Sequence, residues 1–98
     1  MNTSIIRNAI ANRELIEFNY RGYPRVAEPH AYGIKDGKRQ IVIFQVGGLS
    51  SAGTIQDWRR ISLDEISSLK ATGIKFGGLR ADRPAEYDNW DTIISVVK

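Results

Sequence analysis

Residues 14–33, with the sequence ELIEFNYRGYPRVAEPHAYG, decide the fold. In their first part Ile16, Phe18 and Tyr20 alternate with polar residues, which is the two-residue period of a half-buried β-strand. Residues 21–24, RGYP, then supply the Gly and Pro of a turn, and a second apolar-rich run follows. This stretch therefore predicts a β-hairpin.

The second run of the hairpin, over residues 25–34, alternates less regularly. Pro29 has no N–H to donate to a neighbouring strand, so it predicts an edge or a bulge. We therefore expect Arg25, Glu28 and His30 on a strand that is bent or exposed near its middle. Polar side chains presented there form either a site or an ordinary solvated edge.

The whole chain predicts a single mainly β domain, residues 1–98, with flanking helices. Its 98 residues suffice for one modest core. The sequence Asp-Gly at residues 36–37 is a strong signal for a second hairpin. The expected elements are a helix over residues 3–12, strands over 14–20, 25–34, 40–46, 58–61 and 67–72, a helical turn at 62–65 that Ser62 caps, and a Gly/Ser-rich connection over 47–57.

The composition changes after residue 76, so residues 77–98 are interpreted as a C-terminal extension of the domain. Trp90, Ile93, Ile94 and Val97 match the spacing of a helix face, although the β-branched residues equally suit an edge strand. We expect a helix here, with a strand or arm as the alternative. Its apolar face should be covered by the rest of the domain or by a second subunit.

The composition argues against a membrane segment and against a metal site. No apolar run approaches the length of roughly 20 residues that a membrane helix needs, and there is no cysteine, so we expect a cytoplasmic protein without a membrane segment. One histidine without cysteine offers too few ligands for a zinc site, and we expect no metal and no cofactor. The net charge is +3, and residues 76–98 hold three basic and four acidic residues. The basic excess therefore lies in the first 75 residues, which is compatible with anionic partners.

Polar and planar side chains gather on neighbouring expected strands. Within residues 58–61, Arg59 should share a face with Ile61, and Arg60 with Trp58. Arginine forms bidentate contacts with phosphate, and aromatic rings stack on bases. The candidate ligand-binding residues are Arg25, His30, Tyr32, Gln45, Arg59 and Arg60, with Trp58 beside them.

This set of residues predicts a site for an anionic ligand, a nucleotide or single-stranded nucleic acid. In the alternative interpretation Tyr32 and Trp58 belong to the core, the arginines are solvated, and the Gln45 amide is satisfied by neighbouring backbone. No serine lies in a nucleophile elbow and no paired carboxylates suggest catalysis, so we expect a protein that is not an enzyme.

The order of these motifs resembles the WYL domain. The resemblance rests on Phe-x-Tyr-Arg at residues 18–21, Arg-Val-x-Glu-Pro-His at residues 25–30, and a Gly-rich turn and apolar strand after them. WYL domains are bacterial and phage ligand-sensing modules with a small Sm-like β-barrel, usually attached to a DNA-binding domain and sometimes standing alone. The resemblance implies a barrel of about five strands within residues 1–76 and a regulatory role. By this resemblance Arg25 and Arg59 match basic positions of the family, and His30 stands where the family often has an aromatic residue.

The sequence departs from the family at two places. The tripeptide that names the family is replaced by residues 39–41, RQI, and two family arginines are replaced by Ser62 and Glu65. Losing two positive charges should weaken phosphate binding. The sequence therefore predicts a regulatory ligand-binding module, and the alternative is a protein-interaction or homodimerisation module without a small ligand.

Overall fold

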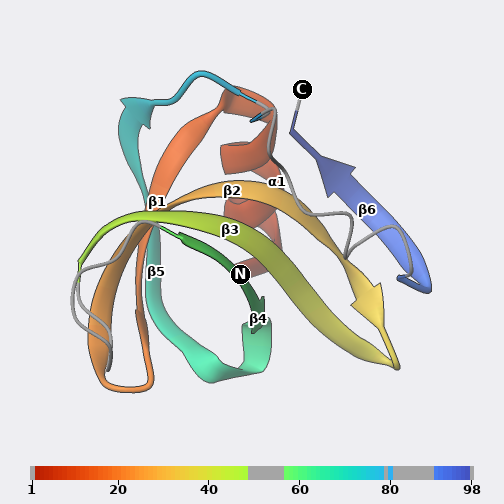
Figure 1. The fold of residues 1–98 in the computed structure, drawn as a ribbon. Helices are drawn as coiled ribbons and strands as arrows, with labels where there is room; N and C mark the ends of the chain where they lie inside the picture. The colour runs from red at the N-terminus through yellow and green to blue at the C-terminus, as the bar shows by residue number, and fades with distance from the viewer. Residues whose placement is uncertain (1, 49–56, 79, 81–89, 98) are drawn as a thin grey trace.

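A six-stranded antiparallel sheet curves around the N-terminal helix in the computed structural model, which describes residues 2–48, 57–78, 80 and 90–97 (Figure 1). The elements in chain order are α1 (Asn2–Asn12), β1 (Glu14–Tyr20), β2 (Tyr23–Lys35), β3 (Lys38–Gly48), β4 (Asp57–Ser62), the 3₁₀-helix η1 (Leu63–Glu65), β5 (Ile66–Lys75) and β6 (Thr92–Val96). The strand order is β4-β3-β2-β1-β5, and β6 pairs with β2. Within the described residues no pairing joins β4 to β5, so the barrel is open there. The predicted mainly β domain with an N-terminal helix is confirmed.

Two tight turns build the hairpins. Arg21 and Gly22 have φ angles of 52° and 81°, and Asp36 and Gly37 have 53° and 78°. Positive φ at both central residues is the type I′ geometry, whose twist matches that of the flanking strands. The second turn lies where Asp-Gly predicted it. The first is shorter than the expected four-residue connector, because Tyr23 already pairs with the last residue of β1.

Strand β2 is the central strand and pairs with β1, β3 and β6. It pairs with β3 along its length, with β1 up to Ala27 and with β6 from Ala31 onward. Pro29 lies between the last β1 pair and the first β6 pair, so the sheet loses little from its missing N–H. The β2–β3 register shifts between Pro29 and Ala31, which makes His30 the extra residue of a bulge. The predicted bulge is confirmed, but Pro29 and His30 are buried rather than exposed.

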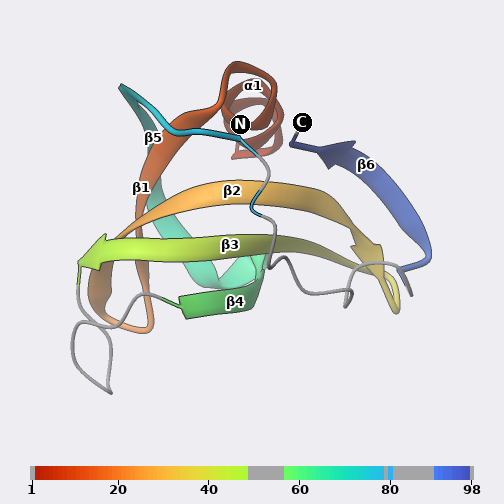
Figure 2. The same cartoon turned by 45° about the horizontal axis from the view of Figure 1, so that its top comes forward.

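The inner face of the sheet, defined as the face toward α1, carries the main core. Figure 2 shows α1 nearly end-on beside β2, between β1 and β6. Ile6, Ala9 and Ile10 recur at helical spacing on one side of α1 and are all buried. They pack with inner-face side chains that include Ile16, Phe18, Ala27, Ile41, Ile43, Ile61 and Leu69. The opposite side of the sheet is called the outer face below.

The C-terminal segment forms a strand, so the preferred helix prediction for residues 90–97 is wrong. Residues 92–96 pair antiparallel with β2, and Val97 N donates to His30 O over 2.8 Å. Because β1 stops pairing at Ala27, the second half of β2 has backbone groups that need partners, and β6 supplies them. Trp90, just before β6, packs on the outer face with Ala31 and Val42.

Several finer predictions can be compared with the described residues. The helical turn at 62–65 is present as η1, but the Ser62 side chain makes no capping hydrogen bond. Strand β5 continues three residues beyond the expected end at residue 72. Most of the expected Gly/Ser-rich connection, residues 49–56, and residues 79, 81–89 and 98 of the extension lie outside the described residues. Of the helices described, none has the length and apolar character to cross a membrane.

Candidate anion-binding site

The predicted site residues are divided between the two faces of the sheet. Directly opposed residues in an antiparallel pair point to the same face, so the register assigns each side chain. Gln45 opposes Ala27 and Arg59 opposes Ile43, which places both on the inner face. Arg60 opposes Val42 and Trp58 opposes Phe44 on the outer face. The inner-face members are Arg25, Tyr32, Gln45 and Arg59, and the outer-face members are His30, Trp58 and Arg60.

Arg25 and Gln45 are joined at one end of the inner face. The Arg25 side chain, 3% exposed, donates from Nη1 to Gln45 Oε1 over 3.3 Å and from Nη2 to Tyr20 O over 3.4 Å. Its guanidinium carbon lies 4.8 Å from the centroid of the Tyr20 ring. Phe18, a residue of the main core, opposes Arg25 on β1. Two buried polar side chains therefore lie directly against the apolar core.

Arg59 brings a second positive charge to the same end. It follows Asp57 by two residues on β4, and Asp57 opposes Gln45. Burial, and then the nearby charge of Arg59, lower the pKa of Arg25. Two cations this close repel each other, and an anion placed between them would relieve the repulsion.

Among the described residues, three side-chain nitrogen donors at this end have no acceptor. Arg25 Nε, Gln45 Nε2 and Arg59 Nε are buried and have no hydrogen-bond partner among the described residues. Gln45 is completely buried, and its Oε1 accepts a hydrogen bond from Arg25. Its Nε2 group is the part of the amide that still has no partner among the described residues. Buried donors are nearly always paired in folded proteins. The expected backbone partner for Gln45 is absent within the described residues, and an acceptor from a ligand would satisfy these donors.

Tyr32 is a core residue. It is buried against Ile41 and the α1 side chains, and it lies seven residues beyond Arg25, about 23 Å along the strand at its usual rise. The structure does not bring it to the Arg25 end. For Tyr32 the alternative interpretation from the sequence, a place in the core, agrees with its position.

His30 belongs to a separate network on the outer face. Its Nε2 lies 3.0 Å from Glu28 Oε1, and because an ionised carboxylate only accepts, Nε2 carries the proton. Arg80 donates two hydrogen bonds to the same carboxylate, from Nε to Oε1 over 2.8 Å and from Nη2 to Oε2 over 2.9 Å. The Arg80 guanidinium lies 3.8 Å from the centre of the Phe44 ring, and the His30 and Trp58 rings meet edge to face at 4.6 Å. This network fastens the extension to β2.

Glu28 is ionised in this setting. Burial raises the pKa of Glu28, but the hydrogen bonds from Arg80 and His30 outweigh burial, so its pKa is lower than usual. Sequence reasoning missed the pairing with Arg80, which is 52 residues further along the chain and has no local signal. The signal in the sequence is Glu28 itself, because an acidic residue within an apolar strand is rarely buried without a cationic partner.

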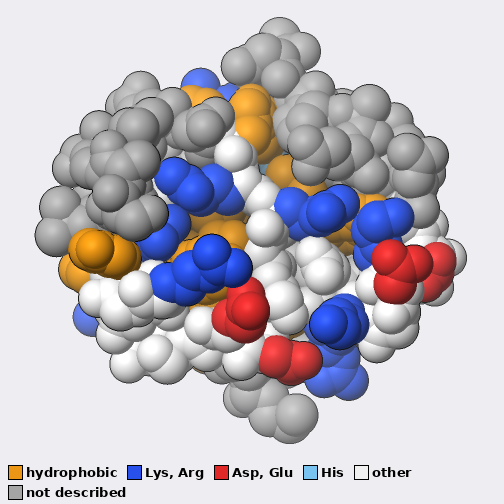
Figure 3. Space-filling model, turned by 60° about the horizontal axis from the view of Figure 1, so that its bottom comes forward, with side chains coloured by type: hydrophobic (Ala, Val, Ile, Leu, Met, Phe, Trp, Pro, Cys, Tyr) orange, Lys and Arg blue, Asp and Glu red, His pale blue; other side chains and the backbone are white. Residues whose placement is uncertain are grey.

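Arg60 is exposed and lies on the outer face. It lines an open groove of about 380 Å³ together with Lys38, Asp64 and Glu65. Figure 3 shows one face of the molecule, where Lys and Arg side chains flank a strip of uncharged surface and acidic side chains lie among them. Mixed charge of this kind gives little attraction for a phosphate by itself.

Neither a search for metal-binding side chains nor comparison with known proteins assigns a function to the site. Across residues 2–48, 57–78, 80 and 90–97, no group of three or more His, Cys, Asp or Glu side chains could hold a metal ion. Comparison with known proteins finds no matching family model, no matching curated protein and no matching solved structure. The resemblance to the WYL domain therefore rests on the sequence motifs alone.

Proposed function

We propose that this domain is a non-enzymatic regulatory module that binds an anionic ligand at Arg25, Gln45 and Arg59. The ligand we propose is a nucleotide or a short segment of single-stranded nucleic acid. One observation carries the proposal: three buried N–H donors, two of them on cationic groups, have no acceptor among the described residues.

A phosphate group matches these donors chemically. Its oxygens accept several hydrogen bonds at once, and bonds between charged partners are shorter and stronger than neutral ones. Burial, and then repulsion from Arg59, lower the pKa of Arg25 in the free protein. A bound negative charge would offset that repulsion. We therefore expect phosphate binding to raise that pKa and to stabilise the fold.

The resemblance to the WYL domain supports the same residues. Arg25 and Arg59 match basic positions of that family, whereas Ser62 and Glu65 stand where it has arginines. A ligand with one or two phosphates suits this reduced set better than a long strand. A WYL-like regulatory role and a cytoplasmic location belong to the same proposal.

The proposed site is narrower than the set predicted from the sequence. His30 is engaged with Glu28 on the outer face, Tyr32 is in the core, and Arg60 projects from the outer face. These three residues are therefore left out of the proposed contact with phosphate.

Adjacent arginines on β4 provide a matched test. Arg59→Gln and Arg60→Gln remove the same charge from neighbouring positions on opposite faces. Binding of a labelled short single-stranded oligonucleotide and of a nucleoside monophosphate is measured by fluorescence anisotropy and calorimetry over a salt series. Arg59→Gln should weaken binding by about 1.5–3 kcal/mol, or about 10- to 150-fold. It should also lower the salt dependence by about one phosphate contact.

The control variant Arg60→Gln distinguishes a specific site from diffuse electrostatic attraction. Arg60→Gln should change affinity by less than about twofold, because it lies on the other face and is exposed. Equal losses in the two variants would mean diffuse attraction without a specific site. If the wild type binds neither probe at low salt, the anionic ligand is excluded.

A second candidate function, a homodimerisation module, is favoured by a separate observation. Strand β6 exposes three β-branched apolar side chains, Ile93, Ile94 and Val96.

A further inference from the structure

Strand β6 has an open edge. It pairs with β2 on one side, and among the described residues no strand pairs with its other side. Figures 1 and 2 both show β6 at the periphery of the sheet. Its sequence, TIISV, contains no charge and no proline, and Ile93, Ile94 and Val96 are 43%, 37% and 37% exposed.

Such an edge invites another strand. Natural proteins usually protect a free edge with charged residues, proline, a bulge or a covering element. Apart from one register shift in its pairing with β2, between Tyr32 and Gly33, β6 carries none of the first three devices. Short, uncharged, β-branched segments are also the ones that pair most readily with copies of themselves.

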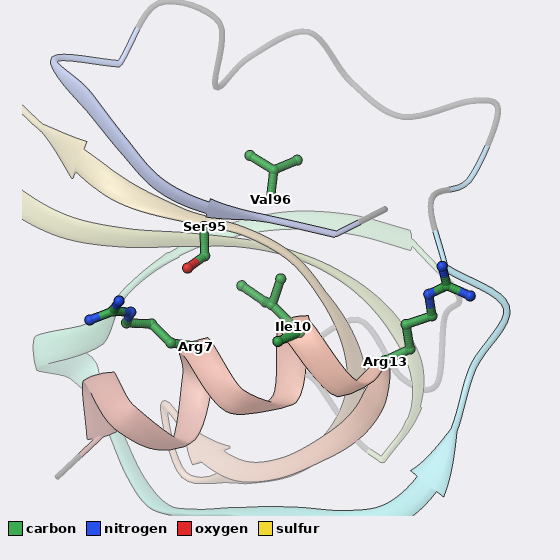
Figure 4. Close-up of a pocket in the computed structure, with 6 residues that line it drawn as sticks. Arg7, Ile10, Arg13, Ser95 and Val96 are labelled. Carbon is green, nitrogen blue, oxygen red and sulfur yellow. The ribbon is translucent and has the colours of Figure 1, made fainter.

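A groove lies between α1 and the C-terminal end of β6. The cavity there has a volume of about 310 Å³ and is lined by Arg7, Ile10, Ala11, Arg13, Ser95 and Val96. Figure 4 shows Arg7 and Arg13 toward opposite ends of the groove, with Ile10 and Ser95 between them. Arg13 lies beside the C-terminal end of β6. Neither arginine forms an ion pair within the described residues, so both charges are available to an acidic partner.

We propose that two copies of this chain associate by antiparallel pairing of their β6 strands. In this arrangement the residue before β6 in one copy lies opposite the end of β6 in the other. That residue is Asp91, which is exposed and has no ion pair among the described residues. Asp91 of each copy then lies near Arg13 of the other, at the end of the groove shown in Figure 4.

Symmetry doubles each of these contacts. A two-fold axis makes the interface self-complementary, so two Asp91–Arg13 pairs flank one continuous strand pairing. The exposed apolar side chains of both copies are removed from water together. The backbone edges of both β6 strands find their missing partners at the same time. A second copy therefore provides partners for the open edge, for the exposed apolar side chains and for the charges of Asp91 and Arg13.

The test is the oligomeric state of the full chain. Sedimentation velocity and light scattering over a range of concentrations should show a reversible monomer–dimer equilibrium. Ile94→Lys places a charge on the open edge and should raise the dimer dissociation constant at least about tenfold. Ile74→Lys is the matched control, because Ile74 is 60% exposed on β5, and it should leave the equilibrium unchanged.

Charge reversal tests the geometry. Asp91→Arg and Arg13→Asp should each weaken the dimer, and combining them should restore it. Circular dichroism should show that all variants keep the β fold. A wild type that stays monomeric at every concentration would overturn the proposal and leave the edge to an extended segment of another protein. Equal effects of Ile94→Lys and Ile74→Lys, or no rescue by the double reversal, would also overturn it.

Discussion

Replacing Gly33 with alanine should loosen the C-terminal extension from the sheet. Gly33 lies on β2 opposite Ile93, and the Trp90 ring packs directly against it. A Cβ atom at this position would overlap the carbonyl oxygen of Thr92 and approach Trp90 Cε3 to 2.6 Å. The backbone oxygen cannot rotate away as a side chain can, so either β6 or Trp90 must move.

The expected loss of stability follows from these contacts. Overpacking of a well-packed site costs about 1–3 kcal/mol. Complete release of Trp90 would cost more, about 4–6 kcal/mol for some 150–250 Å² of buried aromatic surface. A local shift is the cheaper response, and alanine offsets about 0.4–1 kcal/mol by restricting the unfolded chain. We therefore expect Gly33→Ala to lower the free energy of unfolding by about 0.5–2.5 kcal/mol.

Urea unfolding followed by circular dichroism measures this change, and tryptophan fluorescence reports any exposure of Trp90. Gly47→Ala is the control, because a Cβ there would meet only Val26 Cβ at an ordinary 3.7 Å. It should be neutral or slightly stabilising. Should Gly33→Ala unfold at the same urea concentration as Gly47→Ala, the packing of Trp90 against β2 would be wrong.

Two further predictions concern the core and the outer-face network. Phe18→Ala should cost about 3–5 kcal/mol, because Phe18 is buried in the main core; a loss below about 1 kcal/mol in denaturant titration would reject the register of β1. Glu28 has a pKa below its ordinary value of 4.5, so its contribution to stability is present above that pH and is lost as the pH falls through its pKa in the folded state. Melting temperatures measured from pH 6 down to about pH 3 should therefore fall more steeply for the wild type than for Glu28→Gln, and parallel curves would contradict the network.

The hairpins could be predicted from the sequence because their signals are local. Arg21-Gly22 and Asp36-Gly37 occupy turn positions that require positive φ, and alternation on each side sets the strands. The C-terminal strand could not be predicted in this way. Its apolar spacing suits a helix and its β-branched residues suit a strand, and the choice depends on the unpaired half of β2. Ile34 of β2 pairs with Thr92, 58 residues later in the chain, and Ala31 pairs with Val96, 65 residues later, which is beyond any local pattern.

The candidate site was partly within reach of sequence reasoning. Alternation on β4 correctly predicted that Arg59 and Arg60 point to opposite faces, and it separates Arg25 from His30 on β2 in the same way. The bulge at His30 shifts the alternation by one residue and turns Tyr32 into the core, and its position within the β2–β3 ladder was not readable from the sequence.

The side-chain donors of Arg25, Gln45 and Arg59, which have no acceptor among the described residues, carry the proposed site, and NMR of side-chain N–H groups observes them directly. Titration with a nucleoside monophosphate should shift the Nε–H signals of Arg25 and Arg59 and the side-chain amide signal of Gln45. The Nε–H signals of Arg7 and Arg60 should move much less, because both side chains are exposed and lie outside the proposed site. If the signals of Arg25 and Arg59 stay unmoved, or move no more than those of Arg7 and Arg60, the proposed anion-binding site is contradicted.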